Sequence, residues 1–465
     1  MFGISLMLLL PYMAVTDSAY CNGSSYGTEF IFGLLDLPFY VQNNQTALNP
    51  HMSVMVTPEK YSTYYYVTLQ STNSASKTPT IVRTQYYAYR QGEELKFNST
   101  FINRYQDIST GGVINITSDE PVSLMVIYKF TDGDKTDMIT YPVLPTSVLS
   151  TDYVIPSYPA SSDYHGKNQF MVVGLHDSTS IRFEGYETGS MVYDVDDNDI
   201  FMYERRVDIS STSAVSNHPV AIFSWITAGD YSGAPNKDYV GRSLAMQVPP
   251  LDESAVHFVI PPLTGDSIHR YNVRIYASAR NAQVEIHSTS QSTQYVHVYN
   301  KIYYEYTAIF SSDILEILSD NPIVVVQIAL NTYSMPLFMT SVPAVSQFMT
   351  SYKVNFPYIS SYSSQRSVVV TIPYKEASGV LINGDPIIHD TSSLKKSPLG
   401  HYAIIIHKTS RSTLTVDHAG VEQFGLIALR QWQASRGAVE AHGFVPGIQF
   451  EELNCGSVHT SQIVG

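Results

Sequence analysis

The sequence predicts an all-β fold made of about four tandem, β-sandwich-like segments of roughly 100 residues each. Short runs of β-branched and aromatic residues, bounded by Gly, Pro, Asn and Ser, recur throughout, whereas no sustained apolar pattern of period 3.6 appears. Tyr contributes 35 residues and charged residues only 15% of the chain, which is typical of sheets and turns. The same short pattern also returns at a nearly fixed interval, which indicates an internal repeat.

Two repeated strings define the segments. One reads SDEPVSLMVIY, SNHPVAIFSWI and SDNPIVVVQIA, and its copies begin at Ser118, Ser216 and Ser319, with their prolines 98 and 103 residues apart. The other reads TDYVIPSYP, VHFVIPPLT and SYKVNFPYI, and its copies begin at Thr151, Val256 and Ser351. We therefore expect repeats at approximately 25–145, 146–251, 252–345 and 346–430, called the first to fourth segments below, followed by a C-terminal tail over 431–465.

Each segment contains six to eight candidate strands, roughly the content of one β-sandwich. A closed, β-propeller-like ring is the alternative. Each repeated proline is expected at the start of a strand, followed by an apolar run that is buried on both faces. Residues 169–174 with 179–184, and 272–277 with 283–288, are expected to form hairpins. In the fourth segment, LINGDPI at Leu381 and HYAIIIHK at His401 predict strands.

The charge balance argues against a nucleic-acid partner. The formal net charge is -14 and the pI is about 5.4, with no stripe of Lys and Arg that could replace the counterions of a phosphate backbone. A polyanionic partner of that kind is therefore excluded.

The N-terminus is typical of a secreted protein. An apolar run from Ile4 to Val15 is followed by small and polar residues, as in a signal peptide over residues 1–18 with cleavage after Ser18. No later apolar stretch reaches the ~20 residues that cross a bilayer, so we expect no transmembrane anchor. A short buried strand is the alternative interpretation of the apolar run.

The two cysteines, Cys21 and Cys455, lie near opposite ends of the chain. In an oxidising compartment the simplest pairing is a disulfide bond between them. Unpaired thiols, or bonds to another chain, are the open alternatives.

Four sequons lie in the first quarter of the chain. They allow N-glycosylation at Asn22, Asn44, Asn98 and Asn115. Asn115 lies within an alternating, strand-like run, so the other three are the stronger candidates.

The sequence contains no recognisable catalytic signature. It has no nucleophile elbow, H-E-x-x-H, P-loop or dinucleotide-binding glycine string, and its 14 His are scattered. We therefore expect no enzyme, no catalytic residues and no cofactor. The densest set of oxygen ligands is YDVDDNDI, whose Asp194, Asp196, Asp197 and Asp199 form a weak candidate for Ca²⁺; a solvated acidic turn is the simpler interpretation.

Tyrosine clusters are the other candidate functional feature. They occur at 61–66, 86–89 and 303–306. Tyr supplies a broad amphipathic contact area at low entropic cost, but it also fills ordinary strands.

Several longer strings resemble the N-terminal domain of the IgG Fc-binding protein family, extracellular proteins of mucus and matrix. The matching strings are GTEFIFGLLD at Gly27, TDMITYPVLPTSVLSTDYVIPSYP at Thr136, SNHPVAIFS at Ser216, MQVPPLDESAVHFVIPP at Met246, LINGDPI at Leu381 and GHYAIIIH at Gly400. The resemblance spans residues 25–430 and implies a domain over 19–430. The family pattern has cysteines before the second Leu-Pro-Pro element, whereas this chain reads GAPNKDYVGRSLAMQVPP, so that loop is expected to be held differently.

The resemblance implies a secreted interaction domain, and it supplies no catalytic residues. We expect an extracellular binding or adhesion module of the mucus or matrix type that recognises a glycoprotein or glycan, without assuming immunoglobulin Fc as the partner. The alternatives are a self-associating structural matrix protein and, less favoured, a carboxylate-based hydrolase.

Overall fold

The computed structural model describes residues 20–35, 39–40, 47–48, 51–73, 76–97, 112–132, 135–160, 166–227, 243–263, 265, 268–277, 280–332, 334, 336–358, 364–387, 394–433 and 439–454. Within these ranges the regular elements are antiparallel β-strands and three short 3₁₀ helices. The all-β prediction is confirmed.

The third segment shows the arrangement most clearly because its eight strands are separate. One sheet, the outer sheet, has the order β18-β23-β20-β21, and the other, the inner sheet, has the order β22-β19-β24-β25. The strands are β18 (His257–Ile260), β19 (Arg270–Ala277), β20 (Ala282–Ser288), β21 (Gln294–Val298), β22 (Tyr304–Thr307), β23 (Leu315–Ser319), β24 (Ile323–Leu330) and β25 (Pro336–Ser341).

The second segment has the same two orders, but one long strand belongs to both sheets. The first half of β16 pairs with β11 and β13 in the outer sheet, and its second half pairs with β12 and β17 in the inner sheet. The elements are η1 (Thr146–Val148), β11 (Ser150–Ile155), β12 (Asn168–Gly174), β13 (Thr179–Gly185), β14 (Gly189–Val195), β15 (Ile200–Arg205), β16 (Thr212–Ile226) and β17 (Leu244–Gln247).

The first segment is organised like the second: its long strand β9 belongs to both the outer and the inner sheet. Its outer sheet contains β7, β6, β9 and β2, and its inner sheet contains β8, β5, β9 and β10. The strands are β2 (Gly27–Gly33), β5 (His51–Pro58), β6 (Thr63–Asn73), β7 (Ser76–Ala88), β8 (Glu93–Lys96), β9 (Gly112–Asp132) and β10 (Lys135–Val143), with a separate pair β3 (Phe39–Tyr40) and β4 (Ala47–Leu48).

The fourth segment again has separate sheets. Its outer sheet has the order β26-β32-β28-β29 and its inner sheet the order β31-β27-β33-β34, with β30 added beside β31. The elements are η2 (Val345–Gln347), β26 (Ser351–Asn355), β27 (Ser364–Pro373), η3 (Tyr374–Gly379), β28 (Val380–Ile382), β29 (Asp385–Pro386), β30 (Lys395–Lys396), β31 (Tyr402–Thr409), β32 (Thr413–His418), β33 (Gly425–Gln433) and β34 (Val439–Phe444).

The repeated proline string forms the corner at which the chain passes from outer to inner sheet. In each copy the serine Oγ donates to the carbonyl oxygen just before the proline: Ser118 to Glu120 at 2.8 Å, Ser216 to His218 at 2.7 Å and Ser319 to Asn321 at 2.6 Å. The expectation that the proline starts a strand holds for Pro322, but it is wrong for Pro121 and Pro219, which lie inside β9 and β16. The register with the first strand shifts at both places, and a bulge accepts proline because no ladder hydrogen bond needs its missing N–H.

The inner sheets are buried on both faces. Every residue of β24 and of the second half of β16 is buried, as expected for the apolar runs that follow the corner. The second face of each inner sheet packs against the preceding segment. Representative contacts are Trp225 in the core of the first segment, Tyr276 with Leu244 of the second, Val369 in the core of the third and Met125 in the core of the fourth.

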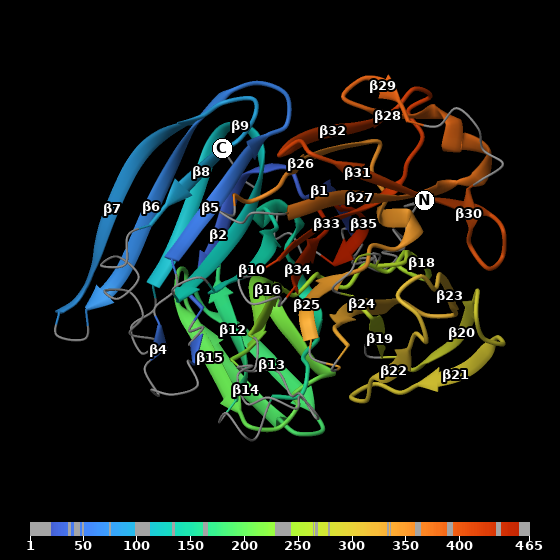
Figure 1. Cartoon of the computed structure of the whole chain (residues 1–465). Coiled ribbons are helices and arrows are strands. Elements are labelled where there is room, and N and C mark those ends of the chain that lie inside the picture. The colour runs from blue at the N-terminus through green and yellow to red at the C-terminus, as the bar shows by residue number, and fades with distance from the viewer. Residues whose placement is uncertain are drawn as a thin grey trace, which may run out of the picture.

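The last strands of the four inner sheets contact one another in a closed cycle. β10 contacts β17, β17 contacts β25, β25 contacts β34, and β34 contacts β10. Figure 1 shows the segments following one another around this centre, from blue through green and yellow to red, with β7, β14, β21 and β29 at the periphery. No segment is therefore left at an open end.

The two ends of the described chain also meet. β1 (Tyr20–Ser24) pairs with β35 (Gln449–Asn454) in an antiparallel sheet. Asp252, which is only 1% exposed, holds β35 in place: its Oδ2 accepts hydrogen bonds from Gln347 Nε2 at 3.2 Å and from the Glu451 amide at 3.1 Å. This carboxylate joins the connections before the third and fourth segments to the C-terminal strand.

Two expectations about the strands are corrected. Residues 431–465 are not simply a tail, because β34 completes the fourth inner sheet and β35 pairs with β1. The predicted strands 169–174, 179–184, 272–277 and 283–288 exist, but they do not form hairpins. In each pair the first strand joins the inner sheet and the second joins the outer sheet, so the connection crosses the core.

A buried carboxylate ties the third segment to the fourth. Glu316 in β23 is fully buried and accepts hydrogen bonds from His257 Nε2 at 3.0 Å and from the Leu399 amide at 3.1 Å. Burial alone raises the pKa of Glu316, but the hydrogen bonds from His257, Ser397 and the Leu399 amide outweigh it and hold the pKa below its ordinary value.

Replacement of Asp252 by Ala is expected to loosen the closure of the chain ends. Because the change removes a charged acceptor from buried donors, we expect a loss of about 2 kcal/mol of unfolding free energy and faster amide exchange in β1 and β35. Urea unfolding and hydrogen–deuterium exchange measure both effects. The exposed Asp385→Ala is the control, and unchanged exchange in β35 would show that Asp252 does not hold this strand.

Replacement of Glu316 by Gln is expected to destabilise the protein in a pH-dependent way. A carboxyl whose pKa is lowered by folding stabilises fully above its unfolded pKa of about 4.3, and this contribution is lost as the pH falls through the lower, folded pKa. The wild type should therefore exceed Glu316→Gln in stability by about 2 kcal/mol at pH 7, and the gap should narrow below about pH 4. Urea titrations at pH 7 and pH 3 measure the gap, with the exposed Glu187→Gln as control; a constant gap contradicts the assignment.

Candidate functional site

The most exposed aromatic surface of the first segment lies on its outer sheet. The pairing of β6 with β7 brings the two N-terminal tyrosine clusters of the sequence together, with Tyr64 directly opposite Tyr87. Strand alternation sends Tyr65 into the core, where it stacks on Tyr86 at 5.4 Å between ring centroids. The tyrosines that cluster in the sequence therefore lie on two faces of the sheet, one turned toward the core and one exposed.

The exposed tyrosines at this edge of the outer sheet make up a surface that we call the tyrosine face. It consists of Tyr61, Tyr64, Tyr87 and Tyr89, which are 70%, 49%, 40% and 60% exposed. The Tyr64 and Tyr87 rings pack edge to face at 4.9 Å, and Tyr87 packs on Tyr89 at 5.2 Å, so the rings hold one another in place.

A depression of about 400 Å³ adjoins the tyrosine face. Tyr64 and Tyr87 line it together with Ser62, Thr63, Asp119 and Glu120. The Glu120 amide donates to Thr63 Oγ1 at 3.1 Å, which fixes the corner beside β6. The surface therefore combines rigid aromatic rings, hydroxyl groups and carboxylates at its rim.

The same position carries different side chains in the other segments. The equivalent cross-strand pairs, placed by their register with the corner serine, are Tyr64–Tyr87, Ser180–Asp194 and Gln283–His297. The third segment also has a depression there, of about 500 Å³, lined in part by Gln283, His297 and Asp320. The backbone repeats, but among these three segments only the first has a pair of tyrosines at this position.

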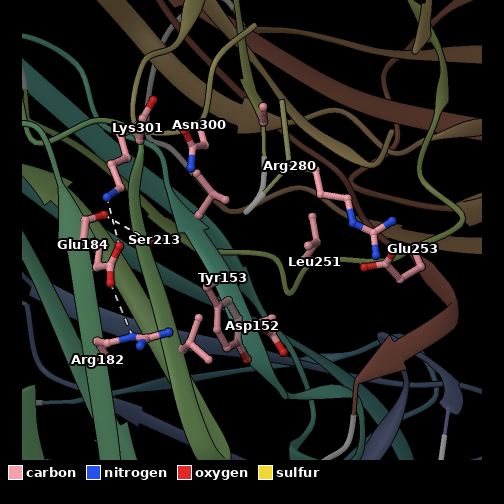
Figure 2. Close-up of a pocket in the computed structure, with 14 residues that line it drawn as sticks. Asp152, Tyr153, Arg182, Glu184, Ser213, Leu251, Glu253, Arg280, Asn300 and Lys301 are labelled. Atoms are coloured by element: carbon pink, nitrogen blue, oxygen red, sulfur yellow. Dashed lines mark hydrogen bonds and ion pairs between the residues drawn. The ribbon is translucent and has the colours of Figure 1, made fainter. Parts of the chain in front are cut away.

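A charged cavity of about 240 Å³ lies between the second and third segments (Figure 2). Glu184 lies between two cations, 2.9 Å from Lys301 Nζ and 3.5 Å from Arg182 Nε. The hydrogen bond and the charge of Lys301 lower the pKa of Glu184. Figure 2 also shows the side chain of Arg280 pointing toward Glu253. The ion pair between Glu184 and Lys301 ties the second segment to the third.

A second tie between these segments is the buried guanidinium of Arg274 on β19. It donates to Glu305 at 2.6 Å and to Asp208 of the second segment at 3.0 Å, and the Tyr303 ring covers it at 4.0 Å. Burial lowers the pKa of Arg274, but Tyr276, Asp208 and Glu305 outweigh it and raise the pKa above its ordinary value. The third tyrosine cluster of the sequence is thus structural here, since Tyr303 packs on this cation.

The sites predicted near the chain ends fall largely outside the described residues. These include the predicted signal peptide, Cys455, Asn44 and Asn98, while only the backbone is described for Cys21 and Asn22. Cys21 lies in β1 opposite Leu453, two residues before Cys455 in the sequence. The disulfide bond and these sequons stay predictions.

Asn115 is the one sequon whose side chain is described. It lies half-buried in β9, and its Nδ2 donates to Asn198 Oδ1 at 2.7 Å. This hydrogen bond occupies the nitrogen that a glycan would need, so the structure keeps Asn115 the weakest of the four candidates.

The acidic run forms the connection from β14 to β15. Asp196 Oδ1 accepts from the Ser178 amide and Asp197 Oδ2 accepts from Asn198 Nδ2, so two carboxylates stabilise the turn. Partial burial and the nearby Asp177 raise the pKa of Asp197. Among the described residues, no three His, Cys, Asp or Glu side chains gather as a metal site, so the arrangement lends no support to Ca²⁺ at Asp194, Asp196, Asp197 and Asp199.

The sequence offered a signal for the tyrosine face but none for the charged cavity. Arg182, Glu184 and Lys301 are ordinary strand and turn residues, and more than 100 positions separate Lys301 from the other two. Only the packing of one segment on the next brings them together. In the described part of the chain, no helix is long and apolar enough to cross a membrane.

Most of the chain matches the model of a known protein family. A family model described as "IgGFc binding protein" matches residues 140–434. No curated protein matches the chain. A solved structure described as "Crystal structure of tetra-tandem repeat in extending region of large adhesion protein" is 11% identical over 92% of this chain and 99% of that chain, with a TM-score of 0.10, and a likeness at that score carries no argument.

The family match covers more than half of the chain and spans the second, third and fourth segments. It includes the strings at Met246, Leu381 and Gly400 that carry the sequence resemblance, whereas GTEFIFGLLD at Gly27 lies outside it. The first segment has the strand order of the other three but precedes the matched range. The chain belongs to the IgGFc-binding protein family.

Proposed function

We propose that this chain is an exported, extracellular binding module and that the tyrosine face of the first segment contacts a protein partner. The observation that carries the proposal is the exposure of Tyr64 and Tyr87 on two neighbouring strands, with Tyr61 and Tyr89 exposed beside the ends of these strands. Exposed tyrosines scattered singly need no explanation, but a contiguous set on a rigid sheet is typical of a contact surface.

The tyrosine face combines features that favour a polypeptide ligand. The rings of Tyr64, Tyr87 and Tyr89 are already packed on one another, so ordering them on binding costs little entropy. Its outermost strand, β7, has a free edge within the described sheet, and an extended segment of a partner can pair with such an edge while its side chains contact the rings. We therefore favour a glycoprotein over a free glycan.

Family membership supports a binding role without naming the ligand. The family description refers to IgG Fc, so Fc is a rational probe, yet the tyrosine face lies in a segment outside the matched range. A site on a fold must be argued from its own residues, so we do not assume immunoglobulin Fc for this chain. The same reasoning leads us to propose a binding module rather than an enzyme.

Three further proposals concern export of the protein and its covalent modification outside the cell. We propose cleavage after Ser18, glycosylation at Asn22, Asn44 and Asn98, and a bond between Cys21 and Cys455. The pairing of β1 with β35 supports that bond, because the strand holding Cys21 lies beside the strand that ends one residue before Cys455.

The architecture behind this surface combines both forms expected from the sequence. We propose four tandem β-sandwich-like repeats that also close into a propeller-like ring. The recurring pair of sheets in each segment supports the first part, and the cycle of contacts among β10, β17, β25 and β34 supports the second.

Self-association is the second candidate function. The specific observation that favours it is the length of β7, a 13-residue edge strand at the periphery of the molecule (Figure 1). A long edge strand can pair with its counterpart in a second copy and so join two copies of the chain.

The test is capture of partners by the secreted, glycosylated protein from the extracellular fluid of its own source. Bound proteins are identified by mass spectrometry, and binding of each, and of purified IgG Fc, is then measured with the double variant Tyr64→Ser, Tyr87→Ser. Because truncated central tyrosines typically cost about 2 kcal/mol, we expect binding weakened by a factor of roughly 30.

The control is Tyr186→Ser, which removes an isolated tyrosine that is 80% exposed in the second segment. It should bind as the wild type does. Equal binding by the double variant contradicts the proposed surface, and recovery of this chain alone favours self-association.

A further inference from the structure

The inner sheet of the fourth segment carries a row of basic side chains on one face. Arg430 on β33 lies directly opposite Arg366 on β27 and, on its other side, directly opposite His442 on β34. Trp432 lies two residues beyond Arg430 and therefore on the same face. We call Arg366, Arg430, Trp432 and His442 the basic row.

The basic row holds hydrogen-bond donors without acceptors. Among the described residues, the buried atoms Arg366 Nε, Arg430 Nε, Arg430 Nη1, Trp432 Nε1 and both ring nitrogens of His442 have no hydrogen-bond partner. Arg430, Trp432 and His442 are only 1%, 2% and 1% exposed, so bulk water does not satisfy them. Buried donors are normally paired, and a cluster of orphans on one sheet face calls for an acceptor.

The guanidinium groups are held by neutral oxygens rather than by carboxylates. Arg430 Nη2 donates to Ser364 Oγ at 3.3 Å, and Arg366 Nη1 donates to the Ser410 carbonyl at 2.8 Å. Like charges placed directly opposite on neighbouring strands repel, and burying a cation without an anion is costly. Within the described ranges no carboxylate contacts Arg430, although the chain has 41 acidic residues against 27 Lys and Arg.

The electrostatic surroundings agree with this geometry. Burial and Arg366 lower the pKa of Arg430 to about 10, and burial, Arg430 and Lys129 lower the pKa of His442 well below its ordinary value. Lys129 on β9 of the first segment is itself paired with Glu94 on β8 at 3.1 Å. Among the described side chains, the charged group of the first segment that acts on His442 is thus a cation already paired with a carboxylate.

We propose that the basic row is a binding site for an oxyanion, a sulfate or carboxylate group carried by an extracellular ligand. The guanidinium of Arg430 has two N–H groups, at Nε and Nη1, without an acceptor, and hydrogen bonds from a guanidinium to an oxyanion are strong because both groups are charged. Trp432 Nε1 and a neutral His442 supply further N–H donors. An anion here supplies the negative charge that the fourth segment lacks along this row.

The site opens at its Arg366 end. Arg366 is partly exposed, as are its neighbours Ser364 and Ser367, while Gln365 is exposed. The row then runs inward from Arg366 through Arg430 to His442. This course favours an acidic group at the end of a ligand, with the rest of the ligand left in solvent. The inference is independent of the tyrosine face, which lies on a different sheet of a different segment.

The test is thermal unfolding of the full secreted chain against sodium sulfate at constant ionic strength, with chloride as the replaced anion. We expect a saturable rise of Tm with sulfate, reaching a plateau. In Arg430→Met the saturable rise should disappear, with affinity for sulfate at least tenfold weaker. The control Arg205→Met removes an exposed arginine that packs on Tyr203, and it should keep the full response.

A second readout separates an anion site from a structural arginine. Without sulfate, Arg430→Met should unfold at the same or a higher temperature than the wild type, because it removes an unpaired buried charge. A clearly lower Tm would show that the chain itself pairs Arg430 and would overturn the proposal. A linear, non-saturating effect of sulfate that is equal in wild type and Arg430→Met would overturn it as well.

Matched ligands identify the source of the oxyanion. A sulfated monosaccharide and a sialic acid are compared with their uncharged counterparts, by calorimetry with wild type and Arg430→Met. Binding of the sulfated sugar alone assigns a sulfate ligand, and binding of the sialic acid alone assigns a carboxylate ligand. If neither these sugars nor inorganic sulfate bind in an Arg430-dependent way, the proposal fails.

Discussion

The rest of the structure depends on one constraint: each inner sheet is apolar on both faces. Its own outer sheet covers only one of them, so a neighbouring segment must cover the other. In an open array the last exposed face would need a cap. Here four segments close on one another through β10, β17, β25 and β34, and the fourth inner sheet meets the first segment. Polar ties such as Arg274 and Glu316 lie at these same junctions and fix how one segment sits on the next.

Closure also separates the stable part of the molecule from the part that can vary. The inner sheets pack on both faces, whereas each outer sheet has one face that is exposed to solvent. The pairs Tyr64–Tyr87, Ser180–Asp194 and Gln283–His297 occupy one structural position with three chemistries. Surface replacements far from the core usually change stability little, so such positions can acquire contacts without disturbing the ring.

The sequence predicted strands well and their partners poorly. The repeated Ser-x-x-Pro string marks a real corner because its hydrogen bond is local, from Ser216 Oγ to the carbonyl two residues later. The strand of residues 169–174 is equally visible in the sequence, yet its partners are β15 and β16, which come tens of residues later. No local pattern encodes that choice, because it is made by burial across the core. The charged cavity and the basic row likewise form through contacts that no local pattern encodes. The tyrosine face is simpler, because one hairpin brings together two tyrosine clusters that are visible in the sequence.

The pairing of β1 with β35 has a consequence for the biogenesis of the protein. The two strands lie at opposite ends of the described sequence, so their contact has nearly the greatest separation that this chain permits. The strands β34 and β35 are synthesised after all the strands of the first three segments, and until then the fourth inner sheet is incomplete and the first segment lacks its neighbour on that side. Until those strands are in place, an apolar face of the first segment stays uncovered, and such a face makes a partly folded chain prone to aggregation.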